Sequence, residues 1–285
     1  MSQEVRRSLI FKSSTIPRWL RTLGRVLLFC LSCAAVLIAS SSLTQWIAGP
    51  WSSVSLAVIA SLGAFALTVL FVRWEGLQLK DVGAMPGRQS LPRVALGFLI
   101  GLLLVVLQSG LVGGMGHIHW VRLPGTGVAP AMFALMVYFV LAVREEVAFH
   151  GYPLRSLDRS IGIWGAQLIV ALIFALEHVA GGMTWLQAFS GAAVGSLLFG
   201  MASLTTRGLA MPIGIHAAWN FGQWMLGEKD SSGFWHPVIE KGFEGRVELA
   251  GSISYLLVMG LAILAFCWYR KAHGGNSEEC APRLE

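Results

Sequence analysis

The chain has 285 residues, of which 55% are hydrophobic and only 13% are charged, and its mean hydropathy is +0.66. An ordinary soluble domain carries about 25% charged residues, so this composition excludes a soluble enzyme, a disordered chain and a disulfide scaffold. The net charge of +6 does not indicate nucleic-acid binding, because these charges lie between apolar segments, where Lys and Arg set orientation and contact anionic lipid.

Eight apolar segments follow one another along the chain, and each is near the roughly 20 residues that a helix needs to cross a bilayer core. Because the runs are continuously apolar and do not alternate, they predict helices and not barrel strands. The predicted fold is all-α, a polytopic transmembrane helical bundle of about eight spans. These spans cover residues 25–48, 53–72, 94–114, 129–150, 162–180, 184–204, 208–226 and 249–269.

Positive charge is distributed unevenly between the two ends of these spans. With a cytoplasmic N-terminus, seventeen Lys and Arg residues fall on the cytoplasmic side and four on the opposite side. This asymmetry predicts that both termini are cytoplasmic. We expect a basic cytoplasmic N-terminal segment at 1–24, a transmembrane helical domain at 25–270 and a cytoplasmic tail at 271–285. The expected location is the inner membrane of a bacterium.

An ionisable residue inside a membrane costs free energy unless it is paired or faces water, so its presence in three of the spans needs an explanation. The fourth span ends with Glu145 and Glu146, which are about 100° apart on a helix. One carboxylate can face the interior while the other pairs with Arg144 or His150; a simple charged helix end is the alternative interpretation. If this helix continues past Glu145 to a turn near Asp158, with a break at Gly151–Pro153, the polar residues of the three spans can meet inside the bilayer. If it stops at Arg144, they do not align.

Three further polar residues lie in the fifth and seventh spans. His178 ends the fifth span, where a satisfied core histidine is the alternative to a functional one. His216 and Asn220 are four residues apart, so they share one helix face. Two hydrogen-bond donors aimed at one point can stabilise an oxyanion, and an interhelical hydrogen bond is the alternative. In the third span, the Gly97-x-x-x-Gly101 spacing predicts close helix contact.

The three motifs together resemble a known family. They are Glu145-Glu146 with Gly151, Phe174-x-x-x-His178 and His216-x-x-x-Asn220, on the fourth, fifth and seventh apolar spans. In this order and spacing they are similar to the CPBP family of CAAX-protease and bacteriocin-processing intramembrane endopeptidases, also called Abi. The resemblance covers residues 128–226.

The resemblance implies an intramembrane endopeptidase that hydrolyses a peptide bond of a membrane-associated peptide or protein. It implies that Glu145 is the general base, that His178 positions the water, and that His216 and Asn220 stabilise the oxyanion. Glu146 receives a supporting role. The family motif is usually Glu-Glu-x-x-x-Arg, and here the sixth position is His150. A histidine can support Glu146 only when it is protonated or when it donates a hydrogen bond as a neutral ring. The contact with Glu146, and the pH range in which the protein is active, are therefore in question.

Zinc is the alternative to a metal-free centre. One carboxylate and two histidines suit zinc, so Glu145, His178 and His216 are the candidate ligands if a metal takes part. We favour a mechanism without metal or other cofactor, because Asn220 is a poor zinc ligand and its helical pairing with His216 fits an oxyanion hole better.

Two other classes of function are consistent with buried Glu and His residues. One is a proton-coupled transporter, against which no inverted repeat is detectable in the sequence. The other is a catalytically silent immunity or scaffold protein, in which His150 would be a sign that the sequence has drifted away from the catalytic motif. The expected partners are membrane lipid and a peptide or protein substrate at the membrane, without nucleic acid. The motifs specify neither the substrate nor an oligomeric state.

Overall fold

The computed structural model describes residues 17–49, 51–229 and 233–274. Of the predicted N-terminal segment 1–24, residues 1–16 lie outside the described residues, as do residues 275–285 of the predicted tail 271–285. Residues 18–24 already belong to the first helix, and the last helix extends to Gly274. Both predicted boundaries of the domain 25–270 therefore fall inside helices.

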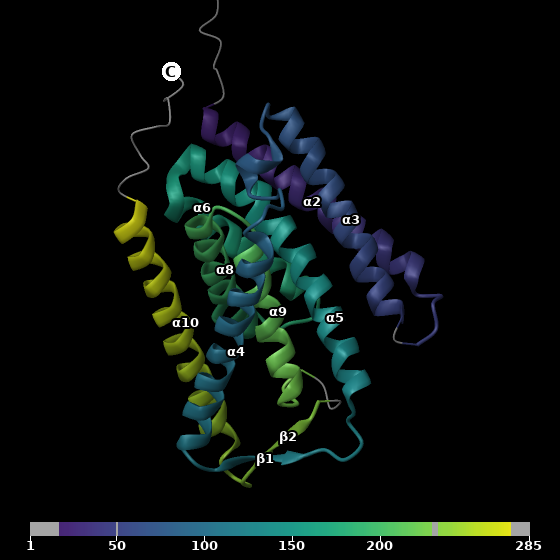
Figure 1. The fold of residues 1–285 in the computed structure, drawn as a ribbon, viewed down its shortest axis with the longest axis vertical. Coiled ribbons are helices and arrows are strands. Elements are labelled where there is room, and N and C mark those ends of the chain that lie inside the picture. Colours follow the sequence, from purple (N-terminus) through teal and green to yellow (C-terminus); the bar gives the residue numbers. More distant parts are fainter. Residues whose placement is uncertain (1–16, 50, 230–232, 275–285) are drawn as a thin grey trace, which may run out of the picture.

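Helices make up nearly all of the described chain, which also contains a pair of short strands (Figure 1). Two segments, η2 and η3, are π-helices, and η1 is a 3₁₀-helix. In chain order the elements are α2 (Arg18–Thr44), α3 (Trp51–Trp74), η1 (Leu79–Val82), α4 (Ser90–Gly114), β1 (Ile118–Arg122), α5 (Val128–Glu145), η2 (Glu146–Gly151), α6 (Tyr152–Ala180), α7 (Trp185–Gln187), η3 (Ala188–Ala192), α8 (Ala193–Thr206), α9 (Ala210–Met225), β2 (Trp235–Ile239) and α10 (Glu244–Gly274).

Six helical stretches of the described residues are long and apolar enough to cross a membrane. The predicted spans 129–150 and 162–180 fall together in one of them, the 53-residue stretch Val128–Ala180. The predicted span 208–226 corresponds to α9, which has 16 residues, fewer than the roughly 20 that cover a bilayer core. The all-α membrane bundle is therefore confirmed, whereas the number of eight spans stays a prediction.

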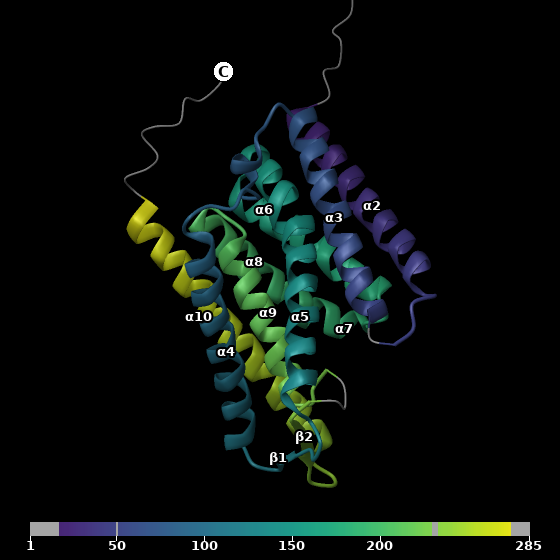
Figure 2. The same ribbon diagram turned by 45° about the vertical axis from the view of Figure 1, so that its right-hand side comes forward.

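The helices run along the long axis of the molecule (Figures 1 and 2). The start of α2 and the end of α10 lie at the same end of the bundle, and the two strands lie at the other. β1 and β2 pair antiparallel, with Ile118 opposite Ile239 and Arg122 opposite Trp235. We call the end that carries β1 and β2 the ribbon end.

The stretch from α5 to α6 carries the first two motifs and is distorted at two places. The π-helix η2 follows α5 directly, and it contains Glu146 and His150. Within α6, Gly162 has a φ of 79° and a ψ of 171°, a conformation that a residue without Cβ adopts readily. The helix is therefore broken at Gly162, and Asp158 lies inside α6, where the sequence predicts a turn.

Glycines allow α4 and α9 to cross at close range. A Cβ atom on Gly97 or Gly101 of α4 would meet the backbone of α9, and one on Gly214 would meet the backbone of α4. Helix backbones approach this closely only where no side chain intervenes. The predicted contact through Gly97 and Gly101 is thus present, and it holds α9, with His216, against α4.

Candidate active site

The two adjacent glutamates lie at the junction of α5 and η2. Glu145 is the last residue of α5, and its side chain is 13% exposed. Glu146 is the first residue of η2, and its side chain is fully buried. The two carboxylates therefore have different surroundings, and only that of Glu145 retains access to water.

His216 of α9 lies between these two carboxylates. Its Nδ1 is 2.8 Å from Oε1 of Glu146, and its Nε2 is 3.5 Å from Oε2 of Glu145. The imidazole stacks on the ring of Phe199, with the centroids 4.3 Å apart and the planes 12° from parallel. An ionised carboxylate only accepts hydrogen bonds, and a neutral imidazole has a single N–H. His216 can donate to both glutamates only as an imidazolium.

His150 occupies the position at which the family usually has arginine. Its Nδ1 lies 2.8 Å from Oε2 of Glu146, four residues earlier, and its Nε2 lies 3.0 Å from Oγ of Ser196 in α8. The His150 side chain is fully buried. Glu146 is consequently held by two histidines, one on each carboxylate oxygen, which come from η2 and α9.

His178 lies near the end of α6. Its Nδ1 is 2.9 Å from the backbone carbonyl of Phe174, one helical turn earlier, and its ring packs at 4.4 Å from that of Phe174. A carbonyl only accepts hydrogen bonds, so Nδ1 carries the proton. In neutral His178 the other nitrogen, Nε2, is then free to accept a proton or a hydrogen bond.

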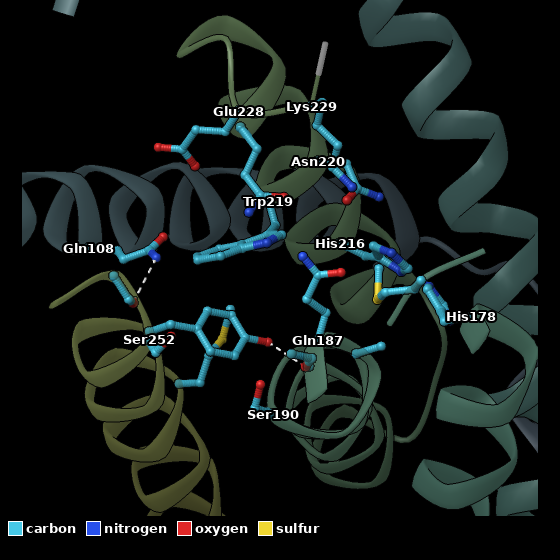
Figure 3. A pocket seen from close by; sticks show the side chains of 18 of the residues that line it. Gln108, His178, Gln187, Ser190, His216, Trp219, Asn220, Glu228, Lys229 and Ser252 are labelled. Carbon is cyan, nitrogen blue, oxygen red and sulfur yellow. Dashed lines mark hydrogen bonds between the residues drawn. The ribbon is translucent and has the colours of Figure 1, made fainter. Parts of the chain in front are cut away.

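A cavity of about 500 Å³ joins three of the expected residues (Figure 3). His178, His216 and Asn220 lie along one side of it, and Gln108 and Ser252 lie across from them. Glu145 does not line the cavity itself and contacts it through His216. The structure thus brings the two glutamates, His150 and His216 into direct contact, and places His178 and Asn220 on the same cavity.

The cavity is buried at one end and exposed at the other. Its buried lining includes Phe174, Phe199 and His216. Its exposed lining is polar and comes from the loop after α9, the first half of α10, and α7. We call this set the polar rim: Gln187, Glu228, Lys229, Glu248 and Ser252. Polar residues within a membrane bundle face a water-filled space, so the rim marks the route by which water reaches the site.

Two charged residues of the polar rim follow α9, and the sequence motifs give them no role. Both side chains are exposed, but the surrounding protein partly desolvates them. This desolvation raises the pKa of the Glu228 carboxyl. It lowers the pKa of Lys229, although the charge of Glu145 acts in the opposite direction. Nothing in the local pattern Gly227-Glu228-Lys229 indicates this position.

Arg144 connects the first two motifs. Its guanidinium donates from one nitrogen to Oε1 of Glu145, at 2.8 Å, and from the other to Oε1 of Glu177, at 2.6 Å. Arg144 is thus the partner of Glu145, while His150 is the partner of Glu146. The sequence offers Arg144 as one of two possible partners for the glutamates, but it gives no sign of the contact with Glu177.

The zinc alternative requires three ligands to gather at one point. Within residues 17–49, 51–229 and 233–274, no three His, Cys, Asp or Glu side chains are grouped so that they could hold a metal ion. Of the three candidate ligands, Glu145 and His216 approach each other at 3.5 Å, and His178 is joined to neither by a hydrogen bond or ion pair in that part of the chain.

Part of the chain matches a known protein family. Residues 127–222 match the family model described as Type II CAAX prenyl endopeptidase Rce1-like. A search of curated proteins found no match. The matched residues run from the start of α5 into α9 and include all six expected site residues. Residues 127–222 are therefore similar to this family of CAAX endopeptidases.

Proposed function

We propose that the chain is an intramembrane endopeptidase that hydrolyses a peptide bond of a membrane-associated peptide or protein. The observation that carries the proposal is the position of His216, between Glu145 and Glu146 and in the buried lining of a cavity with a polar rim. Hydrolysis requires water, a base and an oxyanion stabiliser within reach of one peptide carbonyl. The cavity presents His178, His216 and Asn220 on its wall, and the carboxylate of Glu145 lies 3.5 Å from Nε2 of His216.

In the proposed reaction Glu145 takes a proton from a water molecule that His178 positions through Nε2. The resulting hydroxide attacks the carbonyl carbon, and the oxyanion accepts hydrogen bonds from His216 and from the amide of Asn220. The proton then passes from Glu145 to the departing amine, so that one water is consumed for each bond broken. Oxyanion donors of this kind are among the largest contributors to acyl-transfer catalysis.

Glu146 and His150 support His216 in this proposal. An imidazole donates from Nε2 to an oxyanion, while Nδ1 donates to Glu146, only in its protonated form. A buried carboxylate beside Nδ1 favours that form, and His150 in turn compensates part of the charge on Glu146. The supporting pair therefore sets the protonation state of His216 without touching substrate.

The proposed mechanism uses no metal. What supports this is that both ring nitrogens of His216 already face carboxylates, whereas a zinc ligand would direct one nitrogen to the ion. We further propose eight membrane crossings with both termini in the cytoplasm, in line with the positive charge near the termini. The bacterial inner membrane stays a prediction.

Glu145→Gln tests the proposal. The amide keeps the shape of the carboxyl group but cannot take the proton, so we expect kcat/KM to fall by at least about 100-fold while the purified protein stays folded. A peptide library in detergent, with cleavage followed by mass spectrometry, is the assay. Glu248→Gln is the matched control, because it removes a carboxylate from the polar rim of the same cavity and should leave kcat within about twofold.

Equal activity of Glu145→Gln and the unmodified protein would contradict the role of Glu145. Absence of cleavage in both, together with Glu145-dependent proton flux in liposomes, would favour a transporter instead.

A further inference from the structure

Arg144 occupies an unusual position next to the proposed general base. It is 8% exposed, and its two terminal nitrogens each donate to a different carboxylate, that of Glu145 on α5 and that of Glu177 on α6. The two contacts, at 2.8 Å and 2.6 Å, are in the range of strong charge-assisted hydrogen bonds. A planar guanidinium holds two such partners in a fixed mutual geometry, which an ammonium cannot do.

The Arg144 contacts join two residues that flank the reacting groups. Glu177 directly precedes His178 on the last turn of α6, and Glu145 ends α5. The hydrogen bond that His178 makes within the described residues is to its own helix, through the carbonyl of Phe174. Arg144 is thus the ionic contact, among the described residues, that ties the end of α6 to the carboxylate of Glu145.

We propose that Arg144 is a positioning residue, which acts with Glu177 to keep Glu145 ionised and to hold His178 at a fixed distance from it. This inference rests on the proposed function. A carboxylate in a low-dielectric setting needs a compensating cation, and Arg144 supplies it throughout the working pH range. Glu177 orients the guanidinium and at the same time anchors the turn that carries His178. Neither residue touches the substrate in this proposal.

Three variants test the inference by the separation of kcat from KM. In Glu177→Gln the side chain has the same shape, and Arg144 can still pair with Glu145, so the protein should fold. We expect kcat to fall by at least about tenfold and KM to stay within about twofold. Arg144→Gln should lower kcat by about 100-fold, the size of effect that a misplaced catalytic group produces. Arg144→Lys should retain more activity than Arg144→Gln, because lysine keeps the positive charge although it lacks the planar guanidinium that binds both carboxylates.

The matched control is Arg25→Gln. Arg25 of α2 and Glu75, which follows α3, form another ion pair at 3.3 Å, with side chains 31% and 18% exposed. Loss of this ion pair should leave kcat unchanged, because neither Arg25 nor Glu75 contacts the candidate active site. A thermal unfolding curve for each variant separates loss of fold from loss of positioning.

The outcome distinguishes this inference from the proposed function. If Glu145→Gln is inactive but Glu177→Gln has the kcat of the unmodified protein, the positioning role is wrong and the proposed function stands. If Glu177→Gln and Arg144→Lys lose activity only in proportion to lost folded protein, Arg144 is merely structural and the inference fails. If Glu145→Gln is active, the proposed function itself fails.

Discussion

His150 and Glu146 form a buried pair, with Nδ1 of the histidine 2.8 Å from Oε2 of the glutamate and both side chains inaccessible to solvent. The motif that the sequence resembles usually has arginine at this position. The imidazole is shorter and reaches Glu146 from one turn away along η2. Its other nitrogen contacts Ser196 of α8, so the substitution also ties η2 to a neighbouring helix.

We predict that His150→Ala destabilises the protein strongly. Removal of one partner of a buried ion pair leaves an uncompensated charge and costs about 3–5 kcal/mol. Ser196→Ala is the control, because it removes only the hydrogen bond to the far side of the ring, which is worth about 1 kcal/mol. Thermal unfolding in one detergent gives the ranking. Equal melting temperatures for the two variants would show that the His150 contact with Glu146 contributes no stability.

His150→Arg restores the usual residue of the family but meets a packed site. The ring of His150 lies 6.0 Å from that of Phe174 and 6.2 Å from that of Phe199, and overpacking of such a site costs about 1–3 kcal/mol. We expect His150→Arg to remain active with a lower melting temperature, and the double variant with Ser196→Gly to recover part of that loss. No recovery would mean that Ser196 does not limit the space.

The metal-free mechanism predicts that prolonged chelation leaves kcat unchanged. It also predicts that elemental analysis of the purified protein finds no stoichiometric zinc. We expect both results because the two ring nitrogens of His216 face the carboxylates of Glu145 and Glu146. Activity that is lost with chelator and restored by added zinc would require a different mechanism, in which zinc activates the water.

The predicted orientation can be tested with reporter fusions at Gly245 and Gly274. The two positions lie near opposite ends of α10, a helix that is long and apolar enough to cross the membrane. Reporters active only in the cytoplasm should be active at Gly274 and silent at Gly245. The same result at both positions would contradict the predicted topology.

The crossing of α4 and α9 predicts opposite effects for two substitutions in one helix. In Gly101→Ala the new methyl group would meet the backbone of α9, so we expect a loss of about 1–3 kcal/mol and lower activity through displacement of His216. In Gly110→Ala the methyl group meets nothing within 4 Å, and higher helix propensity should stabilise the protein by about 0.5–1 kcal/mol. Thermal unfolding of both variants is the measurement.

Much of the site could be predicted because its motifs are local. Glu146 and His150 are four residues apart, as are His216 and Asn220, and helical spacing alone puts each pair on one face. The Gly97 and Gly101 spacing likewise indicated a close helix contact. Composition and the length of the apolar runs were sufficient for the membrane bundle, because bilayer thickness sets the length of a spanning helix.

The remaining features depend on contacts between distant residues. Arg144 and Glu177 are 33 positions apart, and the break at Gly162 between them is a backbone conformation that no periodicity shows. The position of His216 between two carboxylates depends on α9 packing beside the junction of α5 and η2, which no local pattern shows. The number of spans stays a prediction, since the stretch Val128–Ala180 combines α5 and α6 across the break at Gly162.

The polar rim has a consequence for the route of the substrate. Its exposed residues lie on α7, on the loop after α9 and on the first half of α10. The loop and the start of α10 lie toward the ribbon end (Figure 1). With the termini in the cytoplasm, as proposed, the ribbon end faces the exterior. A peptide made inside the cell would then be cut only after export, and proteolysis would report that translocation is complete.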